Sequence, residues 1–193
     1  MARTKEFDPD AALDAAMELF WARGYESTST ADLVEHLGIA RASLYATFGS
    51  KHELYLRAFD RYLQATDSNV VGMLSRPGPA LPAVRELVER YAHEALRDPD
   101  RRGCLVVNAA VERMATDPDT ARKVEASWRT LEVALTSALL RARAQGELPE
   151  GAEPAALARF LLVFLQGIRV MSRGAPDEVR LRDAVRQALR VLD

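Results

Sequence analysis

The sequence contains little cysteine and little histidine, and each shortage argues against a kind of protein or site. One cysteine in 193 residues cannot form a disulfide within the chain, so we expect a reducing compartment. The three histidines, at positions 36, 52 and 93, show neither the i, i+4 spacing of a helical metal pair nor a cysteine partner, and we expect no metal site. A serine nucleophile elbow, a phosphate-binding loop and a dinucleotide fingerprint are all absent, so we expect no cofactor and no enzymatic activity.

Long apolar runs are absent as well. The N-terminus has no apolar core of the kind that a secretory signal needs. The longest apolar stretch, residues 160–165, is followed by Gln166 and Arg169, whereas a membrane span needs roughly 20 apolar residues. We therefore expect a cytoplasmic protein with no membrane partner.

Basic charge is in slight deficit. The chain has 26 lysines and arginines against 28 acidic residues, which gives a formal net charge of −2. DNA-binding domains usually carry a basic excess, so the charge balance alone argues against nucleic acid as a partner.

What the sequence does have is helical periodicity in almost every segment, without the sustained alternation of a strand. Capping residues, prolines and glycines divide the chain into about nine expected helices and predict an all-α fold. The expected helices cover about residues 9–23, 30–37, 40–47, 51–74, 81–96, 104–115, 118–144 and 154–173, and a last one opens at Pro176-Asp177.

The second and third expected helices meet at Gly38-Ile39, which is the arrangement of a helix-turn-helix. Their apolar residues are spaced to pack inward against the first helix, while Arg41, Ser43, Tyr45 and Thr47 remain on the outer side. Such small or polar groups are able to enter a major groove.

The residues around this motif carry a family resemblance. The pairs Gly24-Tyr25 and Thr28-Ser29, the triplets Leu37-Gly38-Ile39 and Ser43-Leu44-Tyr45, and Ser50-Lys51 stand at matching spacing. Residues 8–55 thereby resemble the DNA-binding domain of the TetR family of transcriptional regulators. The resemblance implies a helix-turn-helix domain over residues 1–50 and an effector-binding and dimerisation domain over residues 51–193.

The resemblance also implies which residues contact DNA. The phosphate-contacting positions correspond to Thr28, Tyr45 and Lys51, and the groove-facing positions correspond to Arg41, Ala42, Ser43, Ala46 and Thr47. Each phosphate position has a structural alternative: Tyr45 could cover the edge of the core, Thr28 could cap a helix, and Lys51 could be solvated. Lys51 opens a helix, where the dipole disfavours a cation, and a phosphate partner explains that placement better.

The sequence departs from the family pattern in two places. Ala40 replaces the usual serine before the recognition helix and loses a cap worth about 1 kcal/mol. The small Ala46 and Thr47 replace the aromatic or histidine side chains often found there, and suit contact with a thymine methyl.

The C-terminal half is expected to hold the dimer interface. Residues 157–171 are apolar nearly all round, and the last helix adds one apolar face. In the family, the last two helices of each subunit form a four-helix interface, which here implies Leu161, Phe164, Leu165, Ile168, Leu181, Val185 and Leu189. The alternative is that some of these residues belong to the core of a single chain.

The resemblance further implies a cavity for a small-molecule effector. The candidate lining residues are Tyr91, Cys104, Asn108, Met114, Trp128, Leu131, Phe160 and Phe164, a mostly apolar set that indicates a hydrophobic or aromatic effector. Cys104 follows two arginines at an expected helix start, and both features favour a reactive thiolate. Gly103-Cys104-Leu105 is similar to a sequence in a TetR subgroup whose members include cysteine-based sensors of electrophiles. The alternative is that Cys104 is a small buried apolar residue.

Together these observations predict a homodimeric TetR-type repressor that a largely apolar or electrophilic effector releases from a palindromic operator. The alternative is a helical small-molecule-binding protein without operator binding. Residues 1–55 hold five basic and nine acidic side chains, a net charge of −4, so non-specific DNA affinity should be weak. Arg3 and Lys5 could add backbone or minor-groove contacts, or form a disordered tail.

Overall fold

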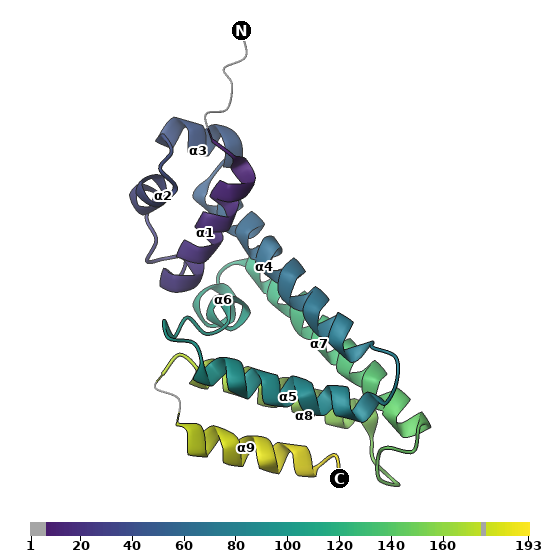
Figure 1. The fold of residues 1–193 in the computed structure, drawn as a ribbon. Helices are drawn as coiled ribbons and strands as arrows, with labels where there is room; N and C mark the ends of the chain where they lie inside the picture. Colours follow the sequence, from purple (N-terminus) through teal and green to yellow (C-terminus); the bar gives the residue numbers. More distant parts are fainter. Residues whose placement is uncertain (1–6, 175–176) are drawn as a thin grey trace.

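A computed structural model describes residues 7–174 and 177–193, and all the regular structure in these ranges is α-helical (Figure 1). The described residues form nine helices, which confirms the predicted all-α class. The helices are α1 (Pro9–Arg23), α2 (Thr30–Leu37), α3 (Arg41–Phe48), α4 (Lys51–Leu74), α5 (Ala80–Leu96), α6 (Leu105–Arg113), α7 (Pro118–Ala144), α8 (Pro154–Met171) and α9 (Glu178–Arg190). The predicted arm with Arg3 and Lys5 lies outside the described residues.

Capping side chains set most of the helix starts. The Asp8 carboxylate accepts the N–H of Asp10 at 2.9 Å, which opens α1. Ser29 and Asp32 form a reciprocal capping box that opens α2, because each side chain accepts the other residue's backbone N–H. Ala40, at the start of α3, provides no such bond. α6 is shorter than predicted, because Cys104 is its N-cap and Arg113 is its last residue.

α1, α2, α3 and the first turns of α4 form one packed unit, which we call the headpiece. Phe20, Leu33 and Leu44 are fully buried at its centre, and Tyr55 of α4 packs with them. The ring of Phe20 lies edge-on to Tyr55 with 5.3 Å between centroids. The headpiece core therefore extends into α4, which continues beside α7 toward the other end of the molecule (Figure 1).

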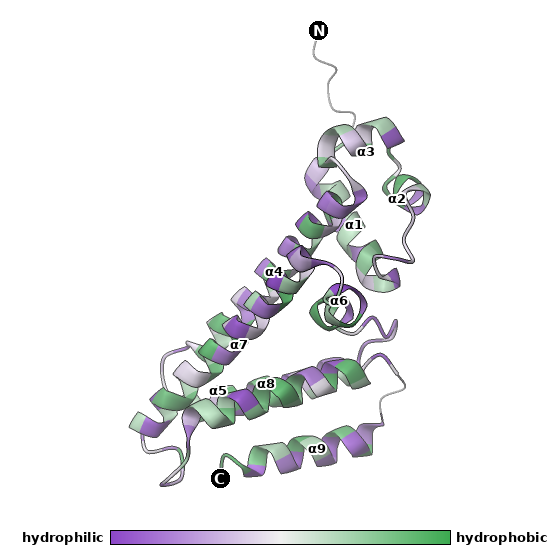
Figure 2. Cartoon of the chain, turned by 180° about the vertical axis from the view of Figure 1, so that it is seen from behind, coloured by the Kyte–Doolittle hydropathy of each residue, from purple (hydrophilic) through white to green (hydrophobic). Residues whose placement is uncertain are grey.

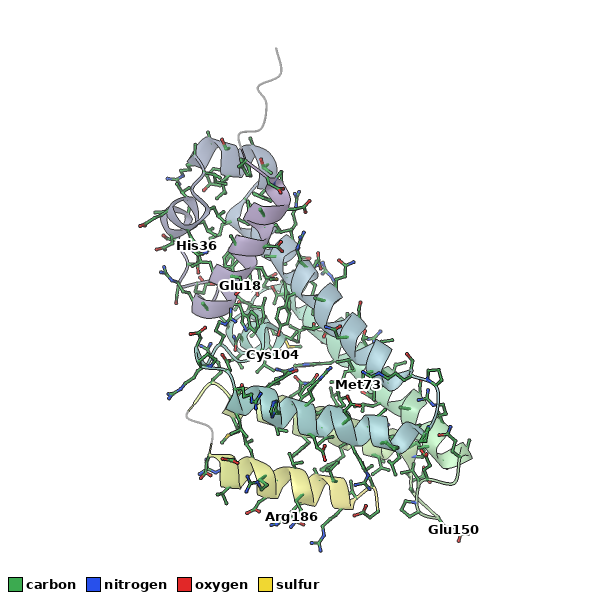
Figure 3. All side chains as sticks on the ribbon, viewed as in Figure 1. Glu18, His36, Met73, Cys104, Glu150 and Arg186 are labelled. Atoms are coloured by element: carbon green, nitrogen blue, oxygen red, sulfur yellow. The ribbon has the colours of Figure 1, made fainter. Side chains whose placement is uncertain are left out.

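The C-terminal helices enclose a larger core. α5 and α8 pack on α7, and α9 lies along α5. A third apolar cluster joins this half to the headpiece, with Phe59 and Tyr62 of α4 packed against the start of α6 and against Trp21 of α1. Figure 3 shows Cys104 in this region, between α6 and α5. The two halves therefore meet through a packed junction.

α8 is the one described helix that is long and apolar enough to cross a membrane by length and composition. Leu161, Leu165 and Ile168 on one side of it are buried in the C-terminal core. Much of α8 is coloured as hydrophobic in Figure 2. Only 28% of the helix is buried, so an apolar face remains uncovered.

Candidate nucleic-acid interface, cavity and dimer face

α3 separates its residues into two faces. Leu44 and Phe48 are buried and fix the helix on the headpiece. Arg41, Ala42, Tyr45 and Ala46 are exposed, and Ser43 and Thr47 are half-buried beside them. The Tyr45 hydroxyl lies 3.3 Å from Thr30 Oγ1, and the Arg41 guanidinium lies 5.7 Å from the centre of the Tyr45 ring. The predicted groove-facing residues therefore share one accessible surface.

The structure gives Thr28 a different role from the predicted phosphate contact. Its side chain is completely buried, and its hydroxyl donates to the carbonyl of Gly24 at 2.6 Å. A buried hydroxyl that is already bonded is not available to a phosphate. Thr28 instead closes the turn between α1 and α2, whereas the capping residue of α2 is Ser29.

Lys51 begins α4 next to this turn. Its ammonium lies 4.1 Å from the centre of the Tyr25 ring, a cation–π contact. Partial burial of the ammonium lowers the pKa of Lys51. Arg113 of α6 also lies over the Tyr25 ring, at 4.3 Å. The turn after α1 is therefore in contact with both a predicted phosphate-binding lysine and the C-terminal half.

The last turn of α6 also holds the turn after α1, by accepting hydrogen bonds from the backbone of that turn. The Glu112 carboxylate accepts the N–H groups of Tyr25 and Glu26 at 3.0 and 2.9 Å. Gly24 has a φ of +87°, and a Cβ there would lie 2.8 Å from a Glu112 oxygen, so glycine is required. Arg113 pairs with Glu26 and with Asp117. Periodicity did not indicate this contact, because Tyr25 and Glu26 lie 87 residues before Glu112 and Arg113.

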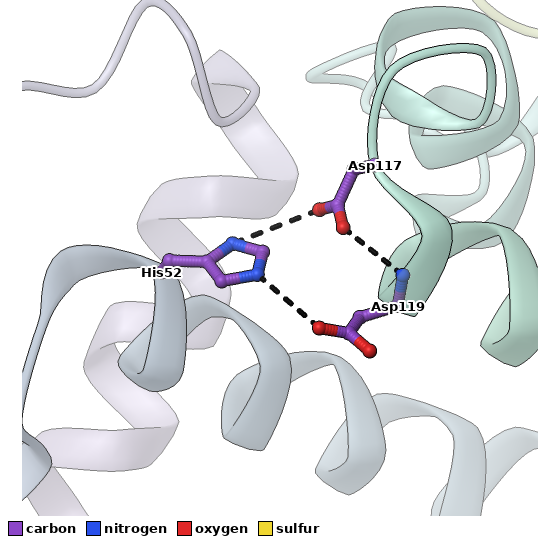
Figure 4. A group of neighbouring side chains, drawn as sticks. All are labelled: His52, Asp117 and Asp119. Atoms are coloured by element: carbon purple, nitrogen blue, oxygen red, sulfur yellow. Dashed lines mark hydrogen bonds and ion pairs between the residues drawn. The ribbon is translucent and has the colours of Figure 1, made fainter.

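The structure also brings together a histidine and two carboxylates that are distant in sequence (Figure 4). His52 Nδ1 lies 3.6 Å from Asp117, and its Nε2 lies 3.8 Å from Asp119. Asp117 is buried, and its carboxylate already accepts hydrogen bonds from the Asp119 N–H, from Thr120 and from Arg113. Because the two ring nitrogens face different carboxylates and Asp117 is largely saturated, the arrangement suits an ion-pair junction between α4 and α7 better than a metal site.

The C-terminal half contains a small internal cavity of about 40 Å³ beside the junction. Four of the predicted residues line it, namely Tyr91, Cys104, Trp128 and Leu131, together with Tyr62 and Arg169. The other four lie elsewhere: Asn108 donates to the carbonyl of Arg102, Met114 packs at the end of α6, and Phe160 stacks with Phe164 toward the surface of α8. Periodicity placed these residues on apolar faces but did not give the direction of each face.

Cys104 is 9% exposed and lies against the cavity. The Tyr62 hydroxyl donates to its sulfur at 3.5 Å. The neighbouring Arg102 turns away from the thiol, stacks on Trp21 and pairs with Glu18. Of the predicted activating features, the helix start is present, because Cys104 is the N-cap of α6, whereas Arg102 is engaged elsewhere and the guanidinium that lines the cavity with the thiol is that of Arg169.

The predicted dimer residues divide into two groups. Leu161, Leu165, Ile168 and Leu181 are buried in their own chain, which corrects their assignment to an interface. Phe164, Val185 and Leu189 are half-buried at the edge of the same core. The apolar side chains that remain exposed on α8 are Phe160, Val163, Val170 and Met171, which we call the α8 face.

Comparison with known proteins identifies both halves of the chain. The family model described as "Bacterial regulatory proteins, tetR family" matches residues 12–58, and that described as "Tetracyclin repressor-like, C-terminal domain" matches residues 80–189. The HTH-type transcriptional regulator YezE of Bacillus subtilis is 42% identical over 195 aligned residues, which cover the whole of both chains. The HTH-type transcriptional repressor ComR of Escherichia coli is 31% identical and covers 98% of this chain and 90% of its own.

Solved structures agree in fold. A cysteine mutant of the TetR family regulator CifR, complexed with a 26-bp operator DNA, aligns with a TM-score of 0.87 and 32% identity over the full length of both chains. Reduced NemR of Escherichia coli aligns with a TM-score of 0.85 at 18% identity, over 95% of this chain and 96% of its own. The chain belongs to the TetR family and is a TetR-type, DNA-binding transcriptional regulator.

Proposed function

We propose that the protein is a cytoplasmic homodimeric repressor, which binds a palindromic operator through α3 and leaves it when a small molecule occupies the C-terminal half. The observation that carries the proposal is the exposed surface of α3, where Leu44 and Phe48 hold the helix while Arg41, Ala42 and Ala46 face outward. The operator complex of the similar regulator CifR supports the same use of this surface.

Dimerisation gives the geometry that operator recognition requires. Two recognition helices about 34–36 Å apart read successive major grooves on one side of the duplex. The α8 face provides an uncovered apolar surface for a second copy, with Val163 71% exposed. The proposed division of the chain places DNA binding in residues 1–50 and effector binding and dimerisation in residues 51–193, with the first turns of α4 completing the headpiece core.

α6 is suited to connect an effector with the headpiece. Cys104 and Val106 at its start line the internal cavity, and Glu112 and Arg113 at its end hold the turn after α1. A ligand that displaced α6 would therefore displace Tyr25 and the neighbouring Lys51. Release follows only if the ligand binds the displaced state more tightly than the DNA-bound state.

The effector that we propose is small and largely apolar or electrophilic. Tyr91, Trp128 and Leu131 give the cavity aromatic and aliphatic walls. Cys104 would be the site of reaction for an electrophile, and without such a reaction it fills space in the junction core.

Footprinting on the DNA that flanks the protein's own gene tests the proposal. The full chain is expected to protect two half-sites related by dyad symmetry. An Ala46→Glu variant, which places a carboxylate on the exposed face of α3, should lose the protection. Ala126→Glu on the exposed side of α7 is the matched control and should keep it. The absence of protection at any palindrome at low salt would instead support a helical small-molecule-binding protein without operator binding.

A further inference from the structure

A second cavity of about 500 Å³ lies where the headpiece meets the C-terminal half, and we call it the vestibule. Its walls come from four helices: Asp14, Met17 and Trp21 of α1, Arg61, Ala65 and Val70 of α4, Arg90, Tyr91 and Glu94 of α5, and Arg169 of α8, among others. Tyr62, Tyr91 and Arg169 also line the internal cavity, so they stand between the two spaces. The vestibule is large enough for a small organic molecule.

The charges around the vestibule are unequal. Arg61 is matched by two carboxylates, because it pairs with Asp10 and Asp14. Arg90 and Arg169 share a third carboxylate, that of Glu94, at 3.5 and 2.8 Å. Since arginine stays protonated in proteins, this pair of guanidiniums faces one negative charge too few.

The hydrogen bonding of the same two arginines is incomplete. The Nε atoms of Arg90 and Arg169 are buried and make no hydrogen bond among the described residues, and the Nε of Arg90 is the atom that lies 3.5 Å from the Glu94 carboxylate. The Arg169 side chain is 17% exposed and stacks on the Tyr91 ring at 4.1 Å, which holds its guanidinium in place. Two guanidiniums that share one carboxylate are short of charged acceptors, and an anion that met the accessible part of the two side chains, which are 29% and 17% exposed, would supply one.

Another part of the lining is apolar and aromatic. Met17 and Trp21 of α1 and Val70 of α4 supply this surface. Trp21 is held in position, because its indole N–H donates to the carbonyl of Gly103 at 3.0 Å and its ring packs edge-on to Tyr62 at 5.1 Å. A ligand that fits both walls has an aromatic body and a single negative group.

We propose that the vestibule binds a small aromatic monoanion of the arylcarboxylate class, with its negative group between Arg90 and Arg169 and its ring against Met17 and Trp21. The inference deepens the proposed function by naming the class of the effector and by placing it in the vestibule in place of the 40 Å³ internal cavity, and it rests on that function in one respect, namely that the bound molecule is the effector. Because α1 supplies one wall and α5 and α8 supply another, an occupant contacts the headpiece and the C-terminal half together. A neutral apolar molecule would leave Arg90 and Arg169 with one carboxylate between them.

Isothermal titration calorimetry on the full chain tests the charge requirement with 2-naphthoate and its neutral counterpart 2-naphthamide. We expect naphthoate to bind at least about tenfold more tightly than naphthamide, because hydrogen bonds to charged groups are the stronger ones. Arg90→Gln should remove that preference. Arg182→Gln on α9, whose side chain is 69% exposed, is the matched arginine control and should leave it unchanged.

Glu94→Gln provides a test that does not depend on removing a stabilising arginine. It removes the carboxylate that competes for the arginine pair, so naphthoate should bind several-fold more tightly than to the unaltered chain. Equal binding of the two probes, no binding of either at millimolar concentration, or unchanged naphthoate affinity in both Arg90→Gln and Glu94→Gln would each overturn the proposal.

Adding naphthoate to the footprinting reaction separates this site from the proposed function. If naphthoate binds tightly and the operator stays protected, the vestibule is a binding site but is not the effector site. A chain that protects no operator can still be titrated, so failure of the repressor proposal does not hide the outcome at the vestibule.

Discussion

Lys51 is the residue for which position and proposed role agree best. It stands at the first position of α4, where the helix dipole disfavours a cation, and its ammonium lies on the Tyr25 ring. A DNA phosphate next to Lys51 would supply the negative partner that the N-terminal end of α4 does not provide. The lowered pKa of Lys51, caused first by burial, indicates that its ammonium is only partly hydrated in the free protein.

We predict that Lys51→Ala weakens binding to all DNA sequences and lowers the slope of log K against log salt by about one. Salt titrations of operator and unrelated DNA measure both effects. Lys123→Ala on α7, where the lysine pairs with Asp60, is the matched control. Loss of the cation–π contact should cost about 0.5–1 kcal/mol of stability, so both variants are compared well below their melting temperatures. An unchanged slope would contradict a phosphate contact.

For single residues, the sequence predicted which side chains are apolar or polar better than it predicted where each side chain points. The exposed and buried faces of α3 followed from helical spacing, because Leu44 and Phe48 stand four residues apart. The family position of Thr28 did not disclose that its hydroxyl turns inward to Gly24. Glu112 was not predicted, because its partners on the far turn come close only in the folded chain.

For the helices, the sequence predicted the capped ends better than it predicted which face of a helix is buried. Caps such as Asp8, Ser29 and Asp117 act within three residues, so the local sequence is sufficient to place them. α8 is apolar nearly all round, and its periodicity gives little preference between the face of Leu161 and the face of Phe160. The packing of α5 and α7 decides that Leu161 is buried and leaves the α8 face open.

The cap of α7 gives a prediction about pH. Burial alone would raise the pKa of Asp117, but hydrogen bonds from Thr120 and the neighbouring Arg113 and His52 outweigh it, so the pKa lies below its usual value. A carboxyl with a lowered folded pKa adds stability that is present above its unfolded pKa of about 3.9 and lost as the pH falls through the folded pKa. The stabilisation should therefore be complete at neutral pH and disappear in acid.

We predict that Asp117→Asn lowers the free energy of unfolding at neutral pH by about 1–2 kcal/mol. The difference from the unaltered protein should shrink as the pH is taken below about 4. Urea unfolding at a series of pH values measures it. Asp119→Asn, at a neighbour in the same turn whose side chain is 45% exposed, should change stability by less than about 0.5 kcal/mol. A difference that stays constant with pH would show that the charge of Asp117 contributes nothing.

At the scale of the whole molecule, operator affinity should depend on assembly more than on charge. The headpiece is acidic overall, so one headpiece alone should bind DNA weakly. Two headpieces held by one dimer bind as a linked pair, and the second contact is then intramolecular. The α8 face is the surface on which this linkage is proposed to depend.

Val163→Asp tests that dependence, because a carboxylate in an apolar interface would be buried without a partner. Sedimentation velocity should show a monomer, and affinity for a palindromic operator should fall by about a hundredfold or more. Val111→Asp on α6 is the matched control, since Val111 is 83% exposed and lies outside the α8 face. It should leave both the dimer and operator affinity intact. A persisting Val163→Asp dimer would place the interface elsewhere, whereas a monomer that retained full operator affinity would show that recognition does not need two linked headpieces.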